Sequence, residues 1–316
     1  MAEKRGIPDQ NSELALSEVV GFILLLGVLV AAFALWMIYI VPANGREAEI
    51  TQMNEVKDRF TDYKISLDSL WVNSPSGASW SQSGVTLSTS MNLGTGGGNT
   101  QASGLFLPML NPIASSAVLA VKDTGDTMTV TSNGPAGPVF KTYTMSILEY
   151  KSQNYYWIQQ TYYYQSGGVF LSQDNGSTCR VSPPISFVAN DATTKSVKIT
   201  PIRLYGVGSM GGNGPVRVDT RFRNLNQTEQ VAVQNSWVNV SVKVSDYNAA
   251  RMWLDVFNTT RRNGQIFTIA QNEYGISPPG SSPATAFMNI SAANVFLKLQ
   301  PAEYDVTLNS IASAIS

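Results

Sequence analysis

The chain has 316 residues, of which 21 are Lys or Arg and 22 are Asp or Glu, so its formal net charge at pH 7 is −1. Nucleic acid is therefore not expected as a partner, because domains that bind it carry a clear excess of basic side chains. Histidine is absent and Cys179 is the single cysteine, which excludes an intramolecular disulfide, histidine-based catalysis and metal sites built from imidazoles or several thiolates. We expect no cofactor, and no catalytic residue is nominated.

The chain begins with a short polar segment, residues 1–13, in which Lys4 and Arg5 are the only basic side chains. We interpret it as a cytoplasmic leader. Residues 14–41 are predicted to form a transmembrane helix, because the run Val19–Val41 has no charged side chain. At about 1.5 Å per residue it crosses the roughly 30 Å hydrocarbon layer.

Two other kinds of segment also contain a long apolar run: a buried core helix and a cleaved secretory signal. A signal has a shorter apolar region, about 7–15 residues, followed by small residues at a cleavage site. No such site follows Tyr39. Trp36 and Tyr39 instead lie near the C-terminal end of the run, where aromatic rings favour the headgroup level of a bilayer.

An amphipathic stalk helix is predicted over residues 45–71. A kink or a break is expected before it at Pro42–Gly45, because proline lacks a backbone donor. Apolar residues recur there every three or four positions: Ile50, Met53, Val56, Phe60, Tyr63, Leu67 and Leu70. Such a stripe must be covered. We expect the chain's own downstream domain to cover it, with a self-associating coiled coil as the alternative.

Residues 72–316 are predicted to form a β-rich extracytoplasmic domain, within which no internal boundary is assigned. Apolar residues alternate with polar ones in several runs, including 85–93, 216–223 and 238–245. This pattern is typical of half-buried antiparallel strands in a sandwich. We expect one short helix, Asp246–Phe257 capped by Ser245, and a closing hairpin around Pro301. The predicted fold class is α+β.

Five Asn-x-Ser/Thr sequons follow the apolar run, and all are candidate N-glycosylation sites: Asn175, Asn226, Asn239, Asn258 and Asn289. At Asn239 the alternating pattern predicts that a glycan would point into solvent. The sequons favour an extracellular domain and a cytoplasmic N-terminus.

The densest aromatic run is a candidate contact patch for a neighbouring subunit or a surface glycan. Its members are Tyr155, Tyr156, Trp157, Tyr162, Tyr163 and Tyr164. The alternative is that one set of alternating rings fills a sheet core while the other forms cross-strand pairs.

The segment Ser17-Glu-Val-Val-Gly-Phe-Ile-Leu-Leu-Leu26 resembles the hydrophobic opening of archaeal type IV pilin-like proteins, whose spans commonly begin Ser-x-Val-Ile/Val-Gly. The resemblance covers about residues 4–71. It implies a bundle of apolar helices, in which Glu18 corresponds to the glutamate that helps to register assembly. Gly21 and Gly27 are further assembly candidates, since glycine lets membrane helices approach closely.

Two features depart from the pilin pattern. Pilin precursors are cut just before the apolar segment after a small residue, whereas Glu13 precedes Leu14 here. Cleavage at Lys4-Arg5-Gly6 would leave residues 7–13 as a polar extension. The outer domain is also large for a major pilin.

We therefore expect a non-enzymatic, pilin-like surface protein that is a minor subunit of a type IV pilus-like filament. Its expected partners are the lipid bilayer and copies of itself or similar subunits. One alternative is a singly anchored envelope protein or adhesin that does not polymerise. A membrane-anchored carbohydrate-active enzyme is the third alternative, because carboxylates alone can hydrolyse glycosidic bonds.

Overall fold

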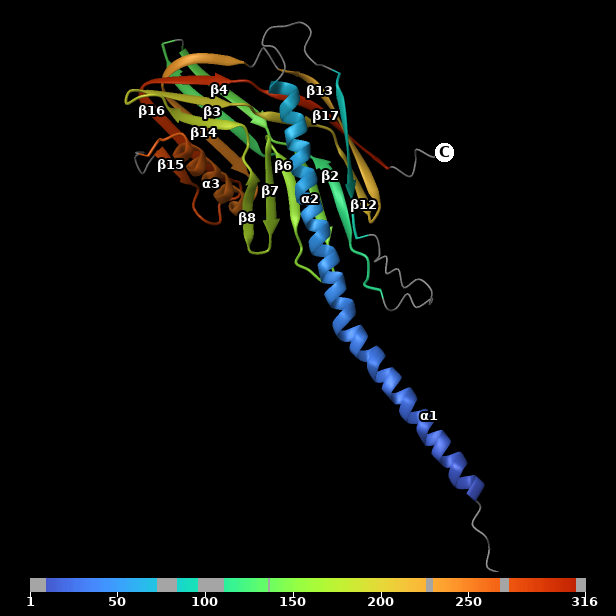
Figure 1. Ribbon diagram of the computed structural model, residues 1–316. Helices are drawn as coiled ribbons and strands as arrows, with labels where there is room; N and C mark the ends of the chain where they lie inside the picture. The colour runs from blue at the N-terminus through green and yellow to red at the C-terminus, as the bar shows by residue number, and fades with distance from the viewer. Residues whose placement is uncertain are drawn as a thin grey trace, which may run out of the picture.

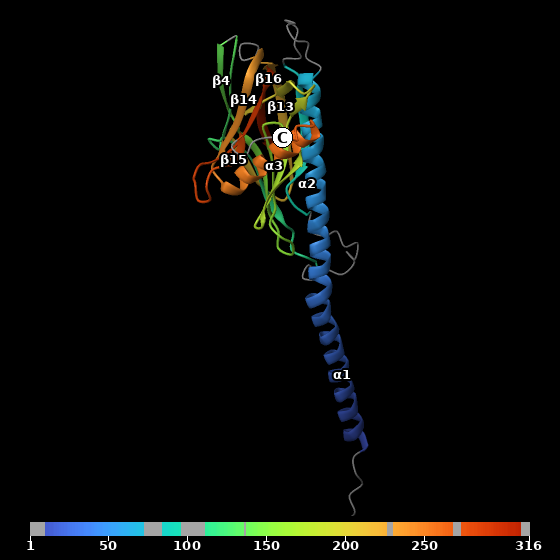
Figure 2. The ribbon, with the colours of Figure 1, turned by 90° about the vertical axis from the view of Figure 1, so that its left-hand side faces the viewer.

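The computed structural model describes residues 10–72, 84–95, 111–135, 137–225, 230–267 and 273–310. It consists of one long N-terminal helical rod and a β-rich domain built on the upper half of that rod (Figure 1). A view at right angles shows the rod running along one side of the domain and projecting beyond it (Figure 2).

The rod comprises helix α1 (Gln10–Leu35), a π-helical segment η1 (Trp36–Ile40) and helix α2 (Val41–Val72), joined without a gap. Of the expected kink or break at Pro42–Gly45, the break does not occur, because the helix is continuous there. In η1 the Val41 N–H donates to the carbonyl of Trp36, five residues earlier instead of four. This wider register accommodates the ring of Pro42, which has no N–H to donate.

Seventeen strands form three sheets in the described residues. The four-stranded sheet contains, in order, β1 (Thr86–Asn92), β13 (Pro215–Leu225), β17 (Ala302–Ser310) and β11 (Ile202–Tyr205). The six-stranded sheet contains β12 (Gly208–Gly212), β2 (Ser116–Lys122), β5 (Ile147–Gln153), β6 (Thr161–Gln165), β7 (Gly168–Gln173) and β8 (Gly176–Val181).

The seven-stranded sheet contains β4 (Gly137–Thr144), β3 (Thr127–Gly134), β14 (Val231–Val244), β16 (Ala284–Leu299), β10 (Thr194–Ile199) and β9 (Ile185–Ala189), with β15 (Tyr274–Ile276) paired to β16. Most pairings are antiparallel, and β10–β16 and β11–β17 are parallel.

The expected closing hairpin around Pro301 is wrong. Strands β16 and β17 belong to different sheets, and the short connection between them is a corner. A second corner, at Pro201 between β10 and β11, runs alongside it, with the Ala302 N–H donating to the carbonyl of Pro201 at 3.0 Å. Each proline leaves the chain extended but removes a ladder donor, so the strand changes sheet instead of folding back on itself.

Two hydrophobic cores lie on opposite faces of the six-stranded sheet. In the first, the stripe of α2 packs on Tyr162 and Tyr164 and on the four-stranded sheet. The second lies between the six- and seven-stranded sheets and is filled by α3 (Tyr247–Asn263), where Phe170 packs on Trp253 with ring centroids 5.4 Å apart. The predicted α+β class with a sandwich-like domain is confirmed.

Helix α3 is longer than predicted and begins one residue later. Its N-cap is Asp246, whose carboxylate accepts a hydrogen bond from the Ala249 N–H at 3.0 Å. The expected cap, Ser245, precedes it. A carboxylate at this position satisfies a free helix N–H and also interacts favourably with the helix dipole.

Candidate functional site

The lower half of the rod is an apolar helix that the other described parts of the chain do not cover. Every residue from Glu18 to Ile40 is exposed, and the exposed fractions of Phe22 and Val28 are 66% and 69%. Among the described residues, this is the one helix long and apolar enough to cross a membrane. It is a candidate membrane span, because such a surface is costly to leave in water.

The upper half of the rod has the opposite character. Six of the seven residues of the predicted stripe are buried and the seventh, Ile50, is half-buried. Phe60 stacks on Tyr162 with centroids 6.3 Å apart, and the hydroxyl groups of Tyr63 and Thr220 lie 2.9 Å apart. Packing of the stripe against the chain's own domain is confirmed over the coiled-coil alternative.

The three assembly candidates are all on the uncovered half. Glu18 is exposed, and a Cβ added at Gly21 or Gly27 would meet nothing within 4 Å. At 3.6 residues per turn, Gly21 lies about 60° from Glu18 around the helix, and Gly27 lies on the face opposite Glu18. Glu18 and Gly21 therefore share one face of the helix, whereas Gly27 lies on the opposite face, so the three positions do not form one site.

The exposed and the buried halves of the rod meet beside a loop, residues 154–160 between β5 and β6, which we call the collar. The carboxylate of Glu49, which is 1% exposed, accepts hydrogen bonds from the backbone N–H groups of Tyr155 at 2.7 Å and Tyr156 at 2.8 Å. A carboxylate that receives two N–H groups makes charge-assisted bonds, which are stronger than neutral ones. The collar is therefore attached to the rod.

Two further contacts close the collar around α2. The ring of Tyr156 lies against Gly45, where an added Cβ would be 2.4 Å from Cδ2 of the ring. The guanidinium carbon of Arg46 lies 4.5 Å from the centre of the Trp157 ring, within the range of a cation–π interaction. Only glycine permits this approach of ring and helix backbone.

The collar also holds its own shape. The Asn154 side chain donates to the carbonyl of Ile158 at 2.9 Å, and its backbone N–H donates to the Gln159 side chain at 3.1 Å. The hydroxyl of Tyr156 accepts a hydrogen bond from the Ile113 N–H at 3.2 Å. A second loop, which leads into β2, is thereby joined to the collar at the same end of the domain.

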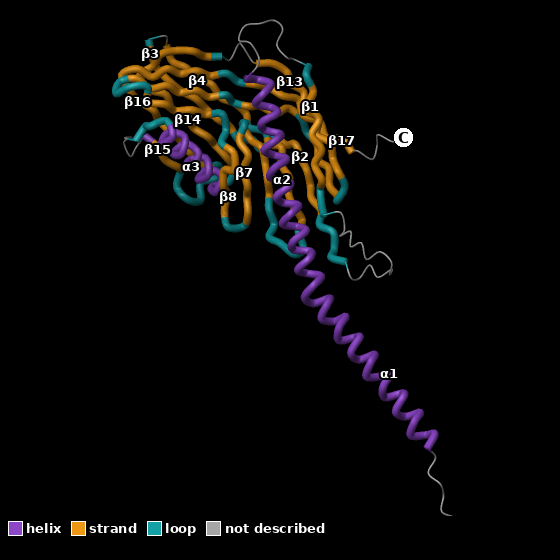
Figure 3. The backbone as a smooth tube through the Cα atoms, viewed as in Figure 1, coloured by secondary structure: helices purple, strands orange, loops and turns teal. Residues whose placement is uncertain are grey.

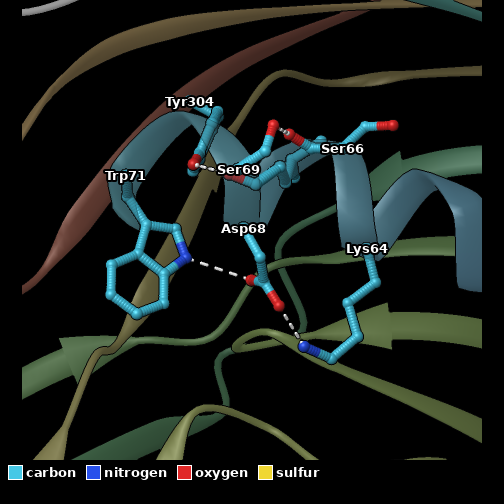
Figure 4. A network of polar contacts seen from close by, with 7 residues as sticks. Lys64, Ser66, Asp68, Ser69, Trp71 and Tyr304 are labelled. Carbon is cyan, nitrogen blue, oxygen red and sulfur yellow. Dashed lines mark hydrogen bonds and ion pairs between the residues drawn. The ribbon is translucent and has the colours of Figure 1, made fainter. Parts of the chain in front are cut away.

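The other end of α2 is fixed by a polar network (Figure 4). The carboxylate of Asp68 forms an ion pair with the largely buried Lys64 and accepts a hydrogen bond from the Trp71 indole at 3.0 Å. The hydroxyl of Tyr304 donates to the carbonyl of Leu67 at 2.7 Å. Because α2 is held at both ends and packed between them, the rod and the domain form one rigid connection.

The structure divides the predicted aromatic patch. Tyr155, Tyr156 and Trp157 belong to the collar, whereas Tyr162 and Tyr164 are buried in the first core. Tyr163 faces the other core, where its hydroxyl lies 3.6 Å from the sulfur of Met252. Burial raises the pKa of the Tyr162, Tyr163 and Tyr164 phenols, consistent with packed core positions. Tyr162 and Tyr164 are therefore core residues, whereas Tyr163 is half-buried against the second core.

The sequons differ widely in exposure. Asn175 is exposed in the turn between β7 and β8, and Asn226 lies outside the described residues. Asn239 and Asn289 are half-buried and directly opposite each other on β14 and β16. Asn239 lies on the face of β14 opposite the buried Val238 and Val240, as the alternation predicts, and it is half-buried there between β3 and β16. The Asn258 side chain accepts a hydrogen bond from Arg261 at 3.1 Å.

Two carboxylates of the β domain, Asp126 and Glu149, have local structural partners. Asp126 accepts hydrogen bonds from the Gln165 side chain at 2.8 Å and from the Ser245 N–H at 3.1 Å, while Glu149 forms an ion pair with Lys122. In the described residues no group of three or more Cys, Asp or Glu side chains could hold a metal ion. Burial raises the pKa of the Cys179 thiol to about 11, which opposes thiolate formation.

Sequence reasoning missed Gly45, Arg46 and Glu49 as contact residues. A signal was present, because Gly45 and Glu49 continue the spacing of the stripe that contains Met53 and Val56. A carboxylate on a buried stripe implies a partner that satisfies it. Comparisons of the chain with protein-family models, with curated proteins and with solved structures find no match.

Proposed function

We propose that this protein is a non-enzymatic, single-pass surface protein, anchored by the helix over residues 14–41, with its β domain outside the cell. The observation that supports this most strongly is the change at Val41. From Val19 to Ile40 the helix is apolar and exposed, whereas after Val41 the same helix is built into the core. If the whole rod were in water, the exposed apolar surface of its first half would have no explanation.

The continuity of the rod supports a retained anchor. A core helix would be covered by its own domain, which residues 18–40 are not. A cleaved signal would be separable from the folded domain, whereas here the apolar helix continues into α2 and the first core. The short leader with Lys4 and Arg5 and the sequons that follow the span favour a cytoplasmic N-terminus.

Anchoring and orientation have a direct test in intact cells. We expect the chain to stay with membranes after alkaline carbonate extraction and to lose its β domain to added protease. A domain that stays protected, while an exposed control protein is cleaved, would contradict the orientation. A chain released by carbonate would contradict the anchor.

Assembly into a pilus-like filament is the second part of the proposal, and the pilin resemblance supports it. In a bundle of apolar helices, Glu18 would be stabilised by a positive group of a neighbouring chain, whereas in a lone anchor it would remain hydrated at the membrane boundary. Glu18→Ala should therefore abolish large detergent-resistant species without reducing membrane insertion. Glu47→Ala, on the exposed face of α2, is the matched control.

Gentle sizing and negative-stain microscopy of surface-labelled protein measure these species, and mass spectrometry of the mature N-terminus completes the test. Processing at Gly6 or near Leu14 supports assembly by the pilin route. Wild-type protein that is always monomeric, with an intact N-terminus, would refute assembly and leave the anchor in place.

One observation favours a second candidate function, an anchored adhesin that recognises surface glycans. Beside the collar is a groove of about 620 Å³. Its lining includes the side chains of Lys151, Gln153, Tyr155, Gln173 and Asp174. Amide groups beside an aromatic ring suit the hydroxyl groups and apolar faces of sugars. A glycan array with the detergent-solubilised chain, compared with Tyr155→Ala, tests this candidate.

A further inference from the structure

We propose that the collar and residues 111–115, which contain Ile113, lie in the headgroup layer of the membrane, so that the β domain is docked on the lipid surface. This inference rests on the proposed anchor and adds a second contact with lipid. The occupant of this surface is the outer leaflet of the bilayer that the anchor itself crosses.

Distance along the rod supports this position. The collar contacts α2 from Gly45 to Glu49, which is about 6–12 Å beyond Val41 at a rise of about 1.5 Å per residue. The polar layers of a bilayer add about 5–8 Å to each side of the hydrocarbon core. A span that ends near Val41 therefore brings the collar to the headgroups without any bend in the chain.

The exposed side chains at this end of the domain suit such an environment. Tyr155 is 62% exposed, Ile158 49% and Ile113 61%, and Trp157 is half-buried beneath Arg46. Tyrosine and tryptophan are enriched at the membrane interface because each has an apolar ring and a polar group. The cation of Arg46 also suits a layer of lipid phosphates.

These side chains come from segments that are far apart in the sequence. The hydrogen bond between Tyr156 and the Ile113 N–H joins the two loops, and Glu49 fixes the collar to the rod. The loops at this end, teal in Figure 3, gather around α2 where the rod leaves the domain. Because this attachment is rigid, insertion of the span determines the height of Ile113 and Ile158 above the hydrocarbon core.

Depth measurements on the full chain test the inference. In a Cys179→Ser background, single cysteines at Ile113, Ile158, Val28 and Val207 receive a nitroxide label, and the protein is reconstituted in phosphatidylcholine vesicles. Each label's collision rates with lipid-soluble oxygen and with a water-soluble nickel chelate give its depth. Val28 reports the anchor. Val207 is the aqueous control, being 92% exposed.

The sheet register places Val207 away from the collar. Its neighbour Gly208 pairs with Val121 near the far end of β2, whereas Ser116 at the near end pairs with Gln153 beside the collar. Ser116 and Val121, near the two ends of β2, are five residues apart, and a strand rises about 3.4 Å per residue.

We expect the oxygen-to-nickel ratio to be highest at Val28 and severalfold higher at Ile113 and Ile158 than at Val207. Ratios at Ile113 and Ile158 equal to that at Val207, with Val28 in lipid, would overturn the docked surface and leave the anchor intact. A ratio at Val28 as low as at Val207 would overturn the anchor and the docked surface together.

Discussion

Replacement of Glu49 by alanine should detach the collar from the rod while the β domain stays folded. The substitution removes the acceptor of the Tyr155 and Tyr156 N–H groups, which lie 2.7 and 2.8 Å from the carboxylate oxygens. A hydrogen bond to a charged group contributes about 1.5–3 kcal/mol when its partner is buried. Because the collar is at the surface, water can replace part of this interaction.

We therefore expect the free energy of opening the collar to fall by about 2–3 kcal/mol in total. Each 1.4 kcal/mol corresponds to a factor of ten, so the Tyr155 and Tyr156 amides should exchange hydrogen about 30- to 150-fold faster. Glu49→Gln keeps one acceptor oxygen but places an amide donor against the second N–H. It should accelerate exchange about tenfold.

Hydrogen exchange with mass spectrometry, on the full chain in detergent micelles, measures both rates. Glu47→Ala is the matched control, since Glu47 is on the exposed face of the same helix. Amides of β5 should keep their wild-type protection in all three variants. If the Tyr155 and Tyr156 amides of the Glu49→Ala variant exchange as slowly as those of the wild type, the proposed role of this carboxylate is refuted.

Three further outcomes are expected. Gly45→Ala should lower the thermal stability of the domain, because the new Cβ would meet the Tyr156 ring at 2.4 Å, although alanine favours a helix by about 1 kcal/mol. The matched change Gly27→Ala, in open space, should leave the same thermal transition unmoved, and equal transitions for both variants would contradict the contact. With a pKa raised to about 11, the Cys179 side chain is about 0.1% thiolate at pH 8. Iodoacetamide should therefore react slowly with the native chain, faster as the pH rises, and rapidly after unfolding. Rapid reaction with the native chain would contradict this, because it would show an accessible thiolate. If the domain is exported into a glycosylating compartment, glycopeptide mass spectrometry should find Asn175 occupied more fully than the half-buried Asn239. Asn175→Gln should remove the glycan at Asn175. Higher occupancy at Asn239 than at Asn175 would mean that modification precedes folding.

Local patterns in the sequence were enough to predict the main elements. The uncharged run Val19–Val41 and the three-and-four spacing from Ile50 to Leu70 each depend on neighbours within one or two helical turns. Alternation in the runs that became β1, β13 and β14 likewise predicted strands with one buried face. Such periodicities record which face of an element is buried, and this is why the fold class followed from them.

The sequence does not say which element covers a buried face. Pro301 lies between two alternating runs, a pattern that predicts a change of direction. The pattern does not indicate in which sheet the chain continues. Asn239 alternates with valines as an exposed residue would, yet strands β3 and β16 flank it on both sides. Pro42 predicts a kink or a break, and the π register of the preceding five residues keeps the helix continuous.

The collar depended on tertiary structure most of all. Glu49 and Tyr155 are 106 positions apart, and each alone is an ordinary polar or aromatic residue. Their hydrogen bond exists because β5 and β6 end where α2 emerges from the first core. Sequence patterns therefore determined the anchor and the stripe of the stalk, which are properties of single helices. Only the tertiary structure determined how the domain is attached to that helix, because the contacts join segments that no local periodicity relates.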